Sequence, residues 1–241
     1  MGITNKQTGT AVDEIEAGIY RIHTPIKDMP GGFSFNQYLV LDDEPLLFHT
    51  GPRKMSPLVR EAIASVIPVG RLRHIAFGHF EADECGGLNE LLAAAPQATA
   101  MCSAIGAMVS TNDFADRPAR GLADHETFNT GKRTFEWLAT PHLPHGWDAG
   151  VLFDKSSRTL FCGDLFTQPG ADCPALVESD ILGPSEGFRG AMDYFSHGKK
   201  LRPLLDSVAA TEPRTLACMH GSAFRGDGGK LLRALGDSLG V

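Results

Sequence analysis

Four short segments that resemble β-strands each end at a histidine or an acidic residue. The residues at these strand ends are His79 with Glu81, Asp83 and Glu84, then His145, Asp164 and His220. In α/β folds the ends of the strands meet along one rim, so side chains far apart in sequence come together there. A single histidine is more often structural than functional. The recurrence predicts an α/β protein with a metal site at one edge of its sheets.

Strand and helix patterns alternate along the whole chain. Residues 56–67 open with Ser-Pro and show helical apolar spacing, and residues 71–79 return to a short buried strand. No internal repeat or low-complexity segment interrupts this alternation. We expect a single domain over residues 1–241, with a polar leader at 1–17 and a loop-rich insertion or lid at 167–196.

Composition excludes several classes of function. The chain has 241 residues, 42% of them hydrophobic, which is enough for a sizeable core. Its net charge of -7 argues against a nucleic-acid partner. The N-terminus has no signal pattern and no apolar run is long enough to cross a bilayer, so we expect a cytoplasmic protein without a membrane partner. Five cysteines without a C-x-x-C motif argue against a disulfide framework or a thiolate zinc site.

The stretch GHFEADECGG concentrates the candidate ligands. His79 and Glu81 lie two residues apart in an extended chain and therefore point the same way. Asp83 and Glu84 follow at the start of a helix, where negative charge is favoured. An acidic helix start facing water is the alternative interpretation of these carboxylates, but it does not explain the three histidines and the aspartate at the strand ends.

This order and spacing resemble the metallo-β-lactamase superfamily, whose motif is H-x-H-x-D-H followed by a later His, Asp and His. Glu81 stands where the hydrolases have a second histidine, and this is similar to the flavodiiron and oxygen-binding di-iron branch. The segments FNQYLVLDDEPLLFHTG and PHGWDAGVLF also resemble that branch. The resemblance covers about residues 18–225 and implies an αββα four-layer sandwich.

The resemblance also implies a set of metal ligands. His79, Glu81 and His145 would bind one metal, Asp83 and His220 the other, and Asp164 would bridge the two. Asp83 and Glu84 are also candidate catalytic residues. The family motif has a histidine where this chain has Glu84, which would bind the second metal, hydrogen-bond to a metal-bound water, or face solvent. We therefore expect the removal of Glu84 to weaken only the second metal.

The ligand chemistry favours hard metals. Imidazoles combined with three or four carboxylates suit iron or manganese better than zinc, and two irons are the first expectation. The resemblance then implies a protein that binds or reduces dioxygen or nitric oxide, or senses them. Because no flavodoxin module follows the domain, we expect no bound flavin and a separate flavoprotein or rubredoxin-like electron donor; a homodimer is a further expectation.

Two alternatives remain open. A metal-bridging hydroxide would hydrolyse an ester, thioester or lactone, although Glu81 lowers the weight of this hypothesis. A degenerate member would hold one metal or none. Other residues carry weaker signals: His142 and His49 as pocket or supporting residues, Cys218 as a neighbour of His220, and Phe80, Trp147 and Phe166 as an apolar lining.

Overall fold

Two β-sheets pack face to face in the computed structural model, which describes residues 2–240. The first sheet has the strand order β1-β2-β3-β4-β5-β6-β7-β8, and the second has the order β13-β15-β14-β12-β11-β10-β9. The strands of the first sheet are β1 (Ile3–Asn5), β2 (Thr10–Glu16), β3 (Ile19–Ile26), β4 (Phe33–Val40), β5 (Leu46–Phe48), β6 (His74–Ala76), β7 (Thr99–Ser103) and β8 (Arg120–Leu122). Those of the second are β9 (Thr127–Asn129), β10 (Thr134–Ala139), β11 (Gly150–Asp154), β12 (Thr159–Phe161), β13 (Leu176–Val177), β14 (Thr215–Ala217) and β15 (Ala223–Arg225).

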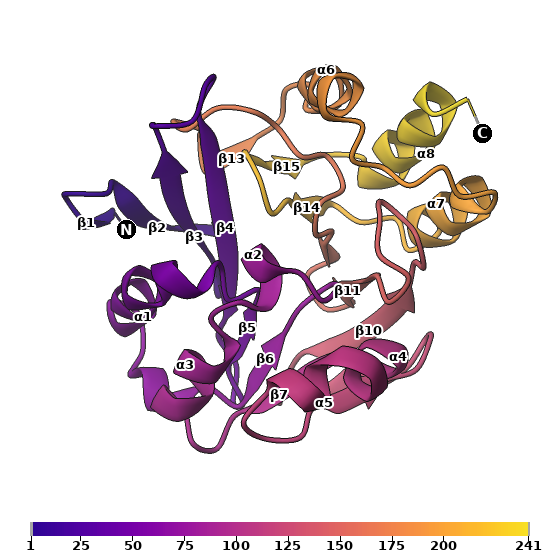
Figure 1. Ribbon diagram of the computed structural model, residues 1–241. Coiled ribbons are helices and arrows are strands. Elements are labelled where there is room, and N and C mark those ends of the chain that lie inside the picture. Colours follow the sequence, from indigo (N-terminus) through magenta and orange to yellow (C-terminus); the bar gives the residue numbers. More distant parts are fainter. Residues whose placement is uncertain (1, 241) are drawn as a thin grey trace.

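Helices cover the outer face of each sheet (Figure 1). The α-helices are α1 (Ser56–Ala64), α2 (Ala82–Cys85), α3 (Leu88–Ala94), α4 (Ala104–Gly106), α5 (Asn112–Phe114), α6 (Leu182–Met192), α7 (Leu201–Ala209) and α8 (Gly228–Ser238). Short 3-10 turns lie at Arg53–Met55 and Val69–Arg71, and a π-helical turn at Ala107–Thr111. None of the helices in residues 2–240 is long and apolar enough to span a bilayer.

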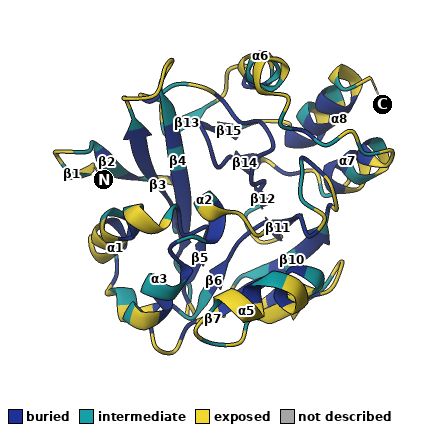
Figure 2. Cartoon of the chain, in the orientation of Figure 1, coloured by how far each residue is buried: buried dark blue, intermediate teal, exposed yellow. Residues whose placement is uncertain are grey.

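Apolar side chains fill the three interfaces between the four layers of helices and sheets. Because side chains alternate along a strand, Ile75 packs toward α1 and α3 while its neighbour Ala76 packs between the sheets. In the second sheet, Leu152 points between the sheets and its neighbours point toward α7 and α8. Figure 2 shows the buried strands lying between helices whose outer faces are exposed. The predicted αββα sandwich is confirmed.

Several elements were not anticipated from the sequence. The expected polar leader begins at residue 1, which lies outside the described residues, and its residues 2–17 contain β1 and β2. Strand β2 pairs with β3 in an antiparallel ladder from Ala11↔His23 to Glu16↔Ile19. Residues 167–196 are not a simple loop, since they contain β13 and the eleven-residue helix α6. Both segments have weak apolar periodicity, and contacts with the rest of the sheet decide their conformation.

Strand directions bring the candidate ligands to one edge. Strands β12 and β14 are parallel, and β10 runs the same way because β11 is antiparallel to both β10 and β12. The C-terminal ends of these three strands therefore lie on one side of the sheet. The two sheets are joined at this edge by a hydrogen bond of 2.9 Å from the Gly150 N–H to the Gly78 carbonyl.

Candidate metal centre

Four side chains form a first group at this edge. His79 follows β6, His145 lies in the loop after β10, Asp164 follows β12, and Glu81 immediately precedes α2. One potential ligand atom from each lies within 4.8 Å of the others. Glu81 Oε2 is 2.6 Å from His79 Nε2 and 2.9 Å from His145 Nε2.

A second group shares Asp164 with the first. It consists of Asp83, Asp164 and His220, again with ligand atoms within 4.8 Å of one another. His220 Nε2 lies 3.1 Å from Asp164 Oδ1 and 3.5 Å from Asp83 Oδ2. The other oxygen of Asp164, Oδ2, faces the first group at 3.5 Å from His145 Nε2. The two oxygens of Asp164 thus divide between the two groups, as in a bridging carboxylate.

The histidine orientations suit metal binding. The Nδ1 atom of His220 lies 2.8 Å from the Ser34 carbonyl, and only a protonated Nδ1 can donate to that oxygen. His79 directs Nδ1 at a carboxylate, 3.0 Å from Glu84 Oε1. In both rings this leaves Nε2 pointing at the acidic groups, which is the arrangement of metal-binding histidines supported by a second hydrogen bond.

The electrostatics of the site favour cations. Burial alone would lower the pKa of His79, but the carboxylates of Glu84, Glu81 and Asp164 raise it to about 12. Burial opposes charge at His220 too, and Asp164 and Asp83 raise its pKa to about 10. Hydrogen bonds from His145 and His79 lower the pKa of Glu81. This negative potential attracts metal cations as well as protons.

Other atoms also fit a metal. Asp83 Oδ1 is buried with no hydrogen-bond partner. The Nε2 atoms of His79 and His145 are only 3.1 Å apart, and both point at Glu81. A cation in the first group satisfies these nitrogens and the Glu81 carboxylate together, and a second cation gives Asp83 a partner that the protein atoms do not supply. The residues present therefore fit two metal ions.

Glu84 lies outside both groups. Its side chain is fully buried, so the solvent-facing alternative is wrong. Its Oε2 accepts a hydrogen bond of 2.7 Å from the His79 backbone N–H, and its Oε1 lies on the Nδ1 side of the imidazole, away from Nε2. Because these contacts are made to His79, the expectation that Glu84 acts only on the second metal is not supported by its position.

His49 supports Glu84 from the opposite side. It is fully buried, and its Nε2 is 3.4 Å from Glu84 Oε1. Burial would raise the pKa of Glu84, but His49 and His79 hold it well below its usual value. His142, the other weaker candidate, is exposed in the loop before His145 and belongs to neither group.

The aromatic lining differs from the one expected. Phe166 is buried in the core behind the second sheet, while Phe80 and Trp147 are 37% and 52% exposed. The rings that contact the proposed ligands come from segments with no metal motif. Phe33 lies 4.4 Å from the His220 ring and stacks on Phe188 of α6 at 5.7 Å, and Tyr194 lies 6.0 Å from the His145 ring.

Only the tertiary structure identifies these aromatic residues. Phe33 begins β4, and Phe188 and Tyr194 belong to the segment expected to form an insertion near the site. Tyr194 also donates a hydrogen bond of 3.2 Å from its hydroxyl to the Asp164 carbonyl. The segment at 167–196 does lie against the site, and its contribution is a partly buried aromatic wall.

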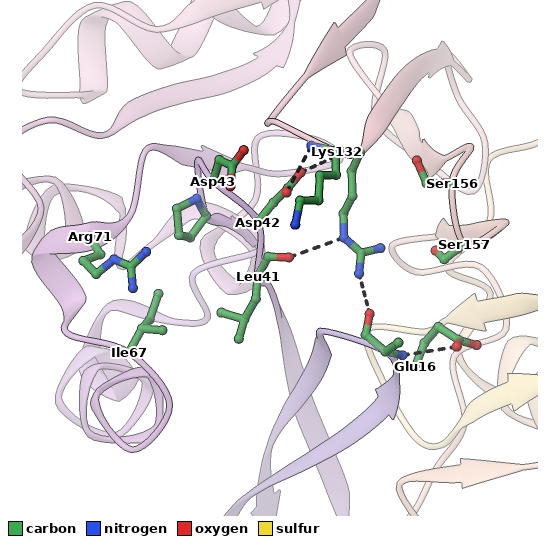
Figure 3. A pocket seen from close by; sticks show the side chains of 12 residues that line it. Glu16, Leu41, Asp42, Asp43, Ile67, Arg71, Lys132, Ser156 and Ser157 are labelled. Atoms are coloured by element: carbon green, nitrogen blue, oxygen red, sulfur yellow. Dashed lines mark hydrogen bonds between the residues drawn. The ribbon is translucent and has the colours of Figure 1, made fainter.

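A pocket of about 610 Å³ lies elsewhere, among loops at the opposite ends of the strands (Figure 3). It is lined by residues such as Asp42, Arg71 and Lys132, and none of the proposed ligands lines it. The carboxylate of Asp42 already accepts hydrogen bonds from the backbone of Lys132 and Arg133. The candidate ligands therefore lie outside this pocket, at the other edge of the sheets.

Comparison with known proteins agrees with this geometry. A family profile described as "ODP family beta lactamase" matches residues 33–221, most of the chain and every proposed ligand. The chain belongs to this family. Membership confirms the predicted resemblance to the metallo-β-lactamase superfamily and its flavodiiron branch.

Individual ODP-family relatives support the same assignment. The chain is 31% identical over 206 residues to the rubredoxin-oxygen oxidoreductase of Megalodesulfovibrio gigas, covering 82% of this chain and 50% of that protein. It is 28% identical over 171 residues to the anaerobic nitric oxide reductase flavorubredoxin of Salmonella arizonae, covering 69% and 35%. The chain thus spans half or less of these relatives. The Flv1 flavodiiron core from Synechocystis has the same fold, with a TM-score of 0.80 at 19% identity, covering 96% of this chain and 61% of that one.

Proposed function

We propose that this protein holds two iron ions and binds or reduces dioxygen or nitric oxide at them. His79, Glu81 and His145 would hold one ion, Asp83 and His220 the other, and Asp164 would bridge them. The single observation that carries the proposal is the division of the Asp164 oxygens between the two groups. The names of the rubredoxin-oxygen oxidoreductase and nitric oxide reductase relatives supply the substrates.

The ligand types support iron over zinc. The described cluster has three imidazoles and three carboxylates, from Glu81, Asp83 and Asp164, and no thiolate. Such a hard, oxygen-rich set suits iron or manganese, and its negative charge stabilises the higher oxidation state. When bound, a pair of ferrous ions would supply electrons for the reduction of a small gas.

The surrounding residues support a small, uncharged substrate. Phe33, Phe188 and Tyr194 present rings beside His220 and His145, while Glu81 is about half exposed and leaves the first group open. An apolar wall next to an open metal position suits a small, uncharged gas. A separate flavoprotein or rubredoxin-like donor would deliver electrons, and we also retain the homodimer and the cytoplasmic location as proposals.

We propose that Glu84 positions His79 and is not itself a ligand. Its two oxygens contact the backbone N–H and Nδ1 of His79, so they fix the ring with Nε2 toward the metal. Acceptors of this kind raise the basicity of a ligand histidine. The catalytic assignment of Asp83 remains a proposal, supported by its place in the second group, where Oδ2 lies 3.5 Å from His220 Nε2.

The test is metal content combined with gas reactivity. Protein produced with iron available is analysed for metals, and its visible spectrum is recorded after anaerobic reduction and after exposure to dioxygen or nitric oxide. About two irons per chain and a spectrum that responds to either gas are expected. Two zincs with a silent spectrum and hydrolysis of a thioester or lactone would overturn the proposal in favour of the hydrolase, and one metal or none would indicate a degenerate site.

A further inference from the structure

Two cysteines lie side by side beneath the proposed metal centre. The sulfurs of Cys162 and Cys218 are 3.8 Å apart, and both side chains are fully buried. They continue the parallel strands β12 and β14, whose last paired residues are Phe161 and Ala217. The Cys162 N–H donates to the Ala217 carbonyl at 3.2 Å, so the ladder extends to the cysteines.

This arrangement is suited to a disulfide bond. Neighbouring strands lie about 4.8 Å apart, within the range of about 4.4 to 6.8 Å between the Cα atoms of bonded cysteines. Both side chains point to the same face, into the apolar layer under α7 and α8. Rotation of the two side chains is the main movement needed to bring the sulfurs from contact to bonding distance.

Both cysteines are also close in sequence to proposed metal ligands. Cys162 precedes Asp164 by two residues, and Cys218 precedes His220 by two residues. A turn at Gly163–Asp164 and a bend at Met219–His220 therefore join each cysteine directly to one member of the second group. Asp164 and His220 themselves are 3.1 Å apart at Oδ1 and Nε2.

Packing alone does not require sulfur at both positions. The other two buried cysteines have close oxygen neighbours: Cys85 Sγ lies 3.2 Å from the Glu81 carbonyl, and Cys102 Sγ lies 3.3 Å from Thr111 Oγ1. Cys162 Sγ and Cys218 Sγ have only longer contacts, at 3.9 Å to the Leu165 carbonyl and 3.8 Å to the Leu216 carbonyl. Alanine or valine would fill the apolar layer at positions 162 and 218 equally well. A thiol pair next to a redox centre, in contrast, stores two electrons.

We infer that Cys162 and Cys218 form a redox-active dithiol that supplies two electrons to the gas reduced at the metal centre. The inference rests on the proposed function. Because both sulfurs are buried, large oxidants and thiol reagents do not reach them in the folded protein, whereas Asp164 and His220 follow the two cysteines by only two residues each. The dithiol is thus coupled to the centre and shielded from the solvent.

The electrons and protons of the step balance. The two S–H bonds break and one S–S bond forms, releasing two protons and two electrons. Dioxygen needs four electrons and four protons to become two waters; the dithiol supplies two of each, two ferrous ions supply the other two electrons, and solvent supplies the other two protons. With nitric oxide, two molecules and the dithiol give nitrous oxide, one water and the disulfide.

The experiment follows the thiols and the gas in the same sample. The full chain, loaded with iron and reduced anaerobically, is freed of reductant and exposed to dioxygen while its uptake is measured. The sample is then quenched in acid, unfolded, alkylated and mapped by mass spectrometry. Of five cysteines, we expect two to be lost to a bond between the peptides of Cys162 and Cys218 and three to be alkylated.

Matched samples separate the alternatives. Metal-free wild-type protein should keep all five thiols, and a Cys102→Ala variant should form the 162–218 bond like the wild type. A Cys162→Ala variant should form no bond and should release hydrogen peroxide, since only two electrons remain for each dioxygen. If that variant fails to fold, the wild-type thiol map alone decides.

Three results would overturn the inference, and they are distinguishable. If the iron-loaded protein takes up dioxygen but keeps five free thiols, the redox role of the two cysteines is refuted and the proposed function stands. Equal disulfide formation with and without metal shows direct oxidation uncoupled from the centre. If the iron-loaded protein takes up no dioxygen, both the proposed function and this inference are refuted.

Discussion

Glu84 offers the sharpest test of how this site holds its first metal. Its carboxylate accepts a hydrogen bond of 2.7 Å from the His79 backbone, lies 3.0 Å from His79 Nδ1 and 3.4 Å from His49 Nε2, and is fully buried. In Glu84→Asp the charge remains, but the side chain is shorter by one methylene and cannot keep both contacts with His79. The variant therefore separates positioning from charge.

The expected magnitude follows from these contacts. Loss of an acceptor that orients a metal-binding histidine typically weakens metal affinity by about 10- to 100-fold, or about 1.4 to 2.7 kcal/mol. The loss of affinity should fall on the first ion, because the contacts of the Glu84 carboxylate with a proposed ligand are made to His79. Glu84→Gln should weaken it at least as much, since it also removes a negative charge from the site.

The assay is a metal titration of the apoprotein against a competing chelator, which resolves two binding steps. Glu90→Gln is the matched control, because Glu90 is a partly exposed residue of α3 paired with Arg53 and lies outside both groups. Wild-type affinity at the first step in Glu84→Asp would refute the positioning argument. If metal affinity is weakened only at the second binding step, Glu84 acts on the second metal, as expected from the sequence.

Three further predictions follow from the same structure. Asp164→Ala should lose both metals, because its two oxygens face both groups, and metal analysis showing two retained ions would contradict the bridge. Metal binding at pH 7 should release protons and tighten as pH rises. Burial lowers the pKa of each of the three ligand histidines, but nearby carboxylates outweigh it and raise the pKa of His145, that of His79 to about 12 and that of His220 to about 10. Calorimetric titration in buffers of different ionisation enthalpy counts those protons, and a count of zero would contradict the shifts. Burial, with Arg21 nearby, lowers the pKa of His23 to about 4, so the unfolded state binds more protons between pH 6.5 and 4 and stability should fall by up to about 3 kcal/mol across that window as pH falls. Urea unfolding should show this fall to be smaller in His23→Gln, and an unchanged pH dependence in that variant would contradict the assignment.

The sequence by itself identified the candidate ligands and predicted that they lie at one edge of the sheets. His79, His145, Asp164 and His220 each follow a strand that local alternation of apolar residues identifies, and strand ends share an edge whatever the details of the topology. Strands at 19–26, 134–139 and 150–154 and the helix beginning at Ser56 were likewise predictable, because their apolar periodicity is strong.

The tertiary structure decided what the sequence left ambiguous. Whether Glu84 binds metal, contacts a water or faces solvent depends on the direction of one buried side chain, and that direction is set by His79 and His49, the latter 35 residues earlier in the chain. The pairing of Cys162 with Cys218 depends on β12 and β14 being neighbours, although the facing residues of these strands are 56 positions apart in the sequence. Contacts between distant segments carry no local periodicity, so only the packed fold reveals them.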